Sequence, residues 1–245
     1  MSRPAPWAVA VMAQAGVEAR VAGRRGENVL AMVGVPLAVL LFFGVFVLAR
    51  PAVGELLPAT LALAIVASGL VNLGIATAYE RGYGVLKRLG GSPLGRSGMV
   101  AAKLGVAVAI TVVQVAGLIA VAALILDWRP GPEASVPAVA VTTVVGAATF
   151  AGFGLTIAST LRPEAALVVA NVLFLLALGF GGVFVPMGDL PASLAAVVRV
   201  LPMGALSEAF AAALGSGDGL AGPLAIVGAW AIASLVLAAR TFRWD

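Results

Sequence analysis

The chain has 245 residues, of which 62% are hydrophobic and only 11% are charged, whereas a soluble domain carries about 25% charged residues. It contains no cysteine and no histidine, which excludes disulfides, haem ligation, zinc sites and catalysis by either side chain. The formal net charge is +4, and basic residues in cytoplasmic loops explain this excess without nucleic acid as a partner.

Residues 5–25 precede the first long apolar stretch, and we predict that they form a helix. The segment is too polar, and the apolar stretch after it too long, for a cleaved signal peptide. Gln14 and Glu18 fall on the same side of this helix as Trp7 and Val11, so its amphipathic pattern is weak. Two interpretations stay open: an interfacial helix with its arginines toward lipid phosphates, or a basic anchor of the first span.

Six stretches without Asp, Glu, Lys or Arg are long enough to cross a hydrocarbon core, which needs roughly 20 apolar residues per helix. They are residues 28–49, 56–79, 104–126, 134–161, 165–188 and 219–239. We therefore predict an all-α membrane protein, with six transmembrane helices in one domain over residues 1–245. Segment 142–158 is rich in Gly, Ala and Thr, which allows close approach of a neighbouring helix.

The basic residues predict the orientation, because Lys and Arg accumulate in cytoplasmic loops. With the N-terminus in the cytoplasm, all but three of the 15 Lys and Arg residues lie on the cytoplasmic side. The three exceptions are Arg50, Arg129 and Arg199. The sequence thus predicts a multi-pass protein with both termini in the cytoplasm, as six crossings require.

The loop 79–103, YERGYGVLKRLGGSPLGRSGMVAAK, separates the second and third spans. Val85, Leu86 and Leu89 are spaced so that they share one face of a short helix. Residues 90–97, GGSPLGRS, resemble a phosphate-binding loop, but Arg96 stands in place of the Lys and no strand precedes it. We therefore exclude this segment as a nucleotide site.

The fifth stretch does not end cleanly, because Pro186, Pro191 and Pro202 interrupt the apolar residues that follow it. The pieces between these prolines are too short to cross a membrane. We predict that segment 182–206 forms re-entrant helices on the external side.

Polar residues within the spans are neutral, which disfavours an ion-coupled secondary carrier. Asn72, Asn171 and Phe174 are candidates for a substrate path, and hydrogen bonding of the amides to a neighbouring helix is the alternative. No paired carboxylates, Ser-Lys pair or metal cluster stands out. We expect no catalytic site in this chain.

Two motif regions resemble the permease subunits of type-2 ABC exporters, the exporters of drugs, polyketides and lipids. The first comprises Glu80-Arg81, the amphipathic segment 85–89, Ser92-Pro93-Leu94 and Lys103, and the second comprises residues 182–186, Leu190-Pro191 and Leu201-Pro202. The resemblance covers nearly all of residues 20–245. The chain departs from the family pattern at Leu201, where Asn is common, and at Gly90-Gly91.

The resemblance implies a six-span permease in the cytoplasmic membrane of a prokaryote, paired with a second copy or a paralogue on two ATPase subunits. ATP and Mg²⁺ would bind to the ATPase, and this chain would bind no cofactor. Loop 79–103 would be the coupling helix, with contacts from Glu80, Arg81, Val85, Leu86, Lys87, Arg88, Leu89 and Pro93. The apolar side chains of Val85, Leu86 and Leu89 would fill a groove of the ATPase.

The exported substrate would be a hydrophobic or amphiphilic small molecule, such as a drug, antibiotic or polyketide, or a lipid, moved out of the cytoplasm or the inner leaflet. Two alternatives stay open: a secondary carrier, or a non-transporting membrane scaffold or assembly component.

Overall fold

The structure is a computed structural model, and it describes residues 6–24, 26–47, 53–89, 94–184 and 189–242. All regular elements in these ranges are helices, which confirms the predicted all-α membrane fold. In chain order they are α1 (Trp7–Arg24), α2 (Gly26–Phe42), η1 (Phe43–Val47), α3 (Val53–Val66), η3 (Ala67–Leu73), α4 (Gly74–Gly82), α5 (Val85–Leu89), α6 (Gly95–Ile125), α7 (Val136–Thr160), α8 (Pro163–Phe180), α9 (Ala192–Val200), α10 (Pro202–Ala213) and α11 (Ala221–Thr241).

Five helices are long and apolar enough to cross a membrane: Val53–Gly82, which joins α3, η3 and α4, and then α6, α7, α8 and α11. They coincide with five of the predicted spans, although α6 begins at Gly95 rather than at residue 104. The first predicted span corresponds to α2 and η1, whose described apolar part, Met32–Val47, is shorter than the others. Hydropathy therefore located the spans, and helix continuation into the loops set their ends.

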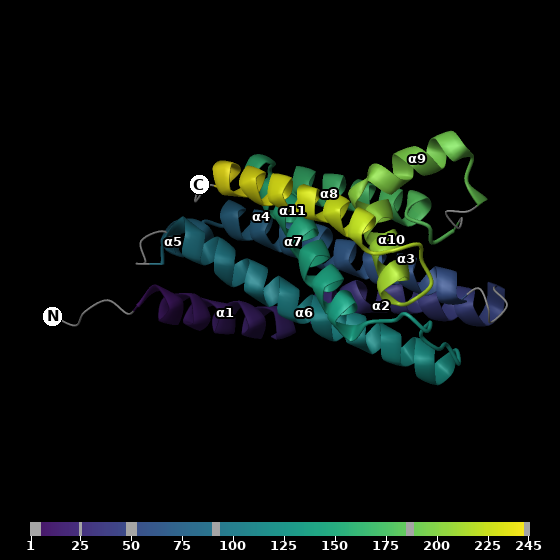
Figure 1. The fold of residues 1–245 in the computed structure, drawn as a ribbon. Coiled ribbons are helices and arrows are strands. Elements are labelled where there is room, and N and C mark those ends of the chain that lie inside the picture. Colours follow the sequence, from purple (N-terminus) through teal and green to yellow (C-terminus); the bar gives the residue numbers. More distant parts are fainter. Residues whose placement is uncertain (1–5, 25, 48–52, 90–93, 185–188, 243–245) are drawn as a thin grey trace.

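Different elements lie at the two ends of the bundle (Figure 1). The beginning of α1, the end of α11 and the short α5 lie at one end, and α9, α10 and the α6–α7 connection lie at the other. Both described chain ends therefore lie at the same end of the bundle. The α3–η3 part of the second span runs through the middle and is mostly buried, whereas α8 exposes most of its apolar side chains.

The second span contains a π-helical stretch, η3, that packs closely on α7. A Cβ atom added to Gly154 would lie 2.3 Å from the carbonyl oxygen of Gly69, and one added to Gly74 would lie 3.0 Å from the Cα of Gly154. Only small residues permit backbones to approach this closely. The close contact therefore fixes the position of η3 along the axis of α7.

Helices α9 and α10 meet at an angle of 89°. The corner falls at Leu201, whose extended backbone, with φ −69° and ψ 147°, is what a following proline favours. Arg199 Nε lies 2.8 Å from Glu208 Oε1, and Trp230 Nε1 donates a hydrogen bond of 2.9 Å to the carbonyl of Val200. These contacts hold the bent pair at the end of the bundle away from α5. Pro186, in the predicted re-entrant segment, lies outside the described residues.

Candidate coupling site and substrate cavity

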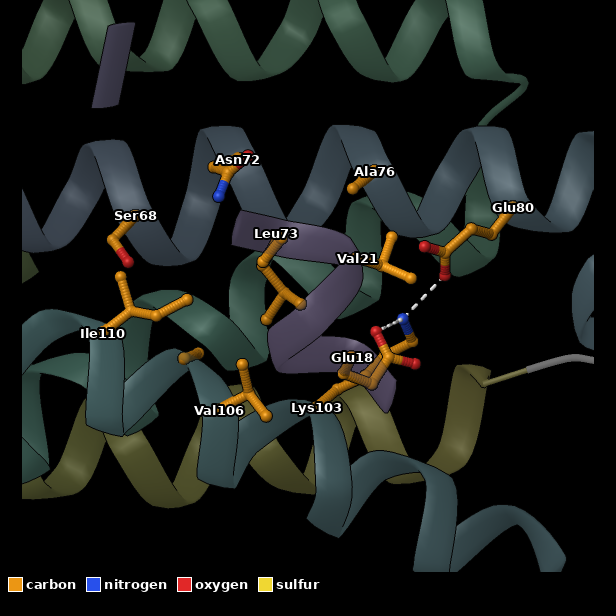
Figure 2. A pocket seen from close by; sticks show the side chains of 12 residues that line it. Glu18, Val21, Ser68, Asn72, Leu73, Ala76, Glu80, Lys103, Val106 and Ile110 are labelled. Carbon is orange, nitrogen blue, oxygen red and sulfur yellow. Dashed lines mark hydrogen bonds and ion pairs between the residues drawn. The ribbon is translucent and has the colours of Figure 1, made fainter. Parts of the chain in front are cut away.

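Lys103 joins three segments that are distant in the sequence (Figure 2). Its Nζ, on α6, lies 2.7 Å from Glu80 Oε2 of α4 and 3.0 Å from Glu18 Oε2 of α1. Gln14 Nε2 donates a further hydrogen bond of 3.0 Å to Glu18 Oε1. The Lys103 side chain is 1% exposed, and those of the two glutamates are 15% exposed or less. Such buried charges are tolerated because they are paired.

This ion-pair cluster explains the weak amphipathic pattern of α1. Gln14 and Glu18 share a side with Val11 because that side faces the bundle, where Val11 packs on an apolar cluster and Glu18 reaches Lys103. The opposite side exposes Val9 and Met12. Helix α1 is therefore attached to α6 by charge as well as by apolar contact.

Arg81 makes a second link from the same span. Its guanidinium donates hydrogen bonds to the carbonyl oxygens of Ser159 and Leu161 at the end of α7. The last carbonyls of a helix lack partners within the helix, and a basic side chain satisfies them well. Close packing accompanies this link, since a Cβ on Gly82 would lie 2.7 Å from Pro163 Cγ.

Helix α5 lies directly after this span, and its orientation differs from our expectation. Leu86 is 1% exposed and packs on Met99, Leu155 and Phe242 of the chain itself. Leu89 is half-buried against the same cluster. The apolar face turns inward because these nearby apolar side chains cover it, so Leu86 does not form an open docking surface.

The outer side of α5 offers different groups to a partner. Tyr83 is 74% exposed and Val85 is 40% exposed, and Lys87 and Arg88 are also exposed. Glu80 and Arg81 are half-buried and contact the chain's own helices. Ser92 and Pro93, the turn of the motif, lie outside the described residues.

The three candidates for the substrate path line one cavity of about 180 Å³. Asn72 comes from η3, and Asn171 and Phe174 come from α8, with Met32 of α2 beside them. Asn72 Nδ2 lies 3.4 Å from Met32 Sδ, and Asn171 Nδ2 donates to the carbonyl of Leu167 in its own helix at 2.8 Å. The structure therefore brings these residues together in a mostly apolar cavity.

Asn72 also lines a smaller cavity of about 60 Å³ that contains Glu18, Glu80 and Lys103 (Figure 2). Asn72 belongs to the π-helical stretch η3, a local irregularity that often marks functional sites. Sequence reasoning missed the contribution of Glu18. The available signal was a carboxylate on the apolar side of the first helix.

Within the described ranges, no group of three or more Asp or Glu side chains is placed to hold a metal ion. The profile of a protein family described as ABC-2 type transporter matches residues 15–214 of the chain. The matched range includes the ion-pair cluster, α5 and the 180 Å³ cavity. No curated protein matches the chain.

Proposed function

Because this chain belongs to the ABC-2 type transporter family, we propose that it is the permease of an ATP-driven exporter. The family implies a transmembrane subunit of an ABC transporter that works with an ATPase partner. Our proposal adds that a separate ATPase docks beside α5 and that the complex exports a hydrophobic or amphiphilic small molecule or a lipid. It further places two ATPases and a second permease, either a copy or a paralogue, in the complex.

The observation that carries the proposal is the convergence of links beside α5. Glu80 connects the second span to α6 and α1 through Lys103, and Arg81 connects it to the end of α7. A displacement of α5 by an ATPase would therefore reach four helices at once. Tyr83, Lys87 and Arg88 remain exposed for that contact.

The cavity lined by Asn72, Asn171 and Phe174 supports an amphiphilic substrate. Its walls are mostly apolar side chains with two amides, so it offers both apolar contact and hydrogen-bonding groups. The exposed apolar face of α8 beside it suits contact with lipid or with the second permease.

A secondary carrier is the second candidate, and the position of the charges disfavours it. Carriers coupled to ions place ionisable groups along the substrate path, near the middle of the bilayer. Here Lys103 lies near the start of α6 and Glu80 near the end of α4, the two helix ends that flank α5 in the chain. An external energy source, acting through α5, fits this arrangement better.

Docking can be tested by purifying the permease with its candidate ATPase and measuring retention of the ATPase and substrate-stimulated ATP hydrolysis. Lys87→Gln with Arg88→Gln should abolish retention, whereas Arg20→Gln with Arg24→Gln, which removes two exposed basic residues of α1, should leave it intact. Equal retention in both double variants would refute docking at α5.

We also propose the cytoplasmic membrane of a prokaryote, with both termini and α5 in the cytoplasm. Since the chain has no cysteine, single cysteines report sidedness without background. Tyr83→Cys should react with an impermeant maleimide only from the cytoplasmic side, and Ala134→Cys only from outside. Reversed reactivity would overturn the orientation.

A further inference from the structure

Helix α1 has an outer face that is turned away from the rest of the bundle. None of its 18 residues is buried, because the helix lies at the margin of the bundle and packs mainly on α6 (Figure 1). Val9, Ala13, Gly16, Arg20 and Arg24 recur at every third or fourth position and therefore share one side of the helix. Apart from the half-buried Gly16, these residues are exposed. We call this side the outer face of α1.

The first half of the outer face is apolar and its second half is basic. Val9 is exposed, and Met12 beside it is 74% exposed, whereas Arg20 and Arg24 lie near the end of the helix. The one carboxylate of α1, Glu18, is turned to the opposite side, where its Oε2 lies 3.0 Å from Lys103 Nζ. The outer face therefore carries positive charge that no acid of α1 balances.

The two arginines are available to a ligand. Within the described part of the chain, neither Arg20 nor Arg24 forms an ion pair or a side-chain hydrogen bond. A Cβ atom on Gly16 would lie 3.8 Å from Arg20 Nη2, so this guanidinium lies along the outer face beside the glycine. Guanidinium groups bind phosphate oxygens with two parallel hydrogen bonds. The outer face thus offers phosphate-binding groups next to exposed apolar side chains.

The neighbours of α1 place this face at the edge of the hydrocarbon core. Glu18 reaches Lys103, which directly precedes the uncharged stretch 104–126 of α6. Arg24 ends α1 shortly before α2 begins. Lipid headgroups occupy this level of a bilayer, and the acyl chains begin beside them. A helix face with both apolar and basic side chains is stable there, because each kind finds a favourable environment.

We propose that the outer face of α1 binds anionic phospholipid, in the cytoplasmic leaflet if the proposed orientation holds. Arg20 and Arg24 bind the headgroup phosphate, and Val9 and Met12 contact the acyl chains. This favours the interfacial helix over the basic anchor as the interpretation of segment 5–25. The proposal goes beyond the exporter function, because it assigns a lipid class to a surface that contacts neither the cavity of Asn72 nor α5. A bound lipid would also hold α1 against α6, since Glu18 links the same helix to Lys103.

The test measures, by native mass spectrometry of the full-length permease, the dissociation constants of phosphatidylglycerol and of phosphatidylcholine with the same acyl chains. The wild type should prefer phosphatidylglycerol. Arg20→Gln with Arg24→Gln should weaken phosphatidylglycerol binding roughly 10- to 30-fold, because each basic residue near an anionic headgroup contributes a factor of about five. Binding of phosphatidylcholine should change less than about twofold, because its headgroup carries no net charge to attract arginine.

A matched control and a conservative variant show whether charge at this face is responsible. Lys87→Gln with Arg88→Gln removes two exposed basic residues of α5 and should change phosphatidylglycerol affinity less than about twofold. Arg20→Lys with Arg24→Lys keeps the charge and should stay within about threefold of the wild type. Phosphatidylglycerol should raise the unfolding midpoint of the wild type and of this lysine variant, but not that of the glutamine variant, since a ligand stabilises only a protein that binds it.

Three results would overturn the proposal. They are equal affinity of the wild type for the two lipids, unchanged phosphatidylglycerol affinity in the glutamine variant of α1, and loss of ATPase retention in that variant with lipid affinity intact, which would assign the face to a protein partner. Lipid binding is measured without the ATPase, so its failure leaves the exporter function standing. Failure of the exporter function appears instead as absent ATP-dependent transport with lipid binding intact.

Discussion

Removing the cation of the buried cluster should destabilise the protein strongly, whereas removing all three charges together should not. Lys103→Met deletes the ammonium that lies 2.7 Å from Glu80 Oε2 and 3.0 Å from Glu18 Oε2. Met keeps most of the side-chain volume. Two mostly buried carboxylates would then lie near each other without their shared cation.

The expected magnitude follows from the distances and the burial. At an effective dielectric constant of about 20, each ion pair at these separations is attractive by roughly 5–6 kcal/mol before desolvation is counted. Desolvation costs several kcal/mol per ion, so the net stabilisation is smaller. Removing one partner of a buried pair typically costs about 3–5 kcal/mol, and we expect this range for Lys103→Met.

Unfolding in detergent micelles with increasing dodecyl sulfate, followed by tryptophan fluorescence, measures the change. The triple variant Lys103→Met, Glu18→Gln, Glu80→Gln should lie within about 1 kcal/mol of the wild type, since neutral replacements of a buried charge cluster are often tolerated. Lys87→Met, at an exposed lysine, should change stability by less than about 0.5 kcal/mol. A triple variant as unstable as the single one would refute the electrostatic explanation and favour loss of packing.

Two further predictions concern α5 and the helix crossing. Leu86→Asp should lower the free energy of unfolding by at least about 3 kcal/mol, because it buries a charge in the apolar cluster. Val85→Asp should leave stability unchanged and reduce retention of the ATPase. The unfolding and copurification measurements described above distinguish these two outcomes. Gly154→Ala should lower the free energy of unfolding by about 1–3 kcal/mol through overpacking against Gly69. Gly179 has open space around it, so Gly179→Ala should raise the free energy of unfolding by about 0.5–1 kcal/mol through helix propensity. Equal unfolding midpoints for the two alanine variants would contradict the close contact.

Hydropathy predicted the spans well because a membrane helix is selected for transfer into lipid along its whole length. It could not predict their ends. Helix α6 starts at Gly95, within the loop expected at residues 79–103, because a helix continues past the hydrocarbon core wherever its backbone stays hydrogen-bonded. The shared apolar face of Val85, Leu86 and Leu89 was predictable from spacing, but the surface that covers it was not.

The ion-pair cluster shows the limit of sequence reasoning more sharply. Glu18, Glu80 and Lys103 are separated by up to 85 positions, and no local pattern reports that they meet. Each residue could be recognised alone, Glu18 as a carboxylate on the apolar side of its helix, and Glu80 and Lys103 as parts of the motif that resembles the permease family. Their partners became evident only when α1 was placed against α6. The grouping of Asn72 with Asn171 and Phe174 likewise required the packing of η3 on α8.

The adjacency of Glu80 and Arg81 has a consequence for motion. Consecutive residues of an α-helix point about 100° apart, and here one side chain is fastened to α1 and α6 while the next is fastened to α7. The end of the second span is thus linked to α1 and α6 through one residue and to α7 through the next. A rotation of α4 about its own axis would therefore act on α1, α6 and α7 at the same time, through two side chains that point in different directions.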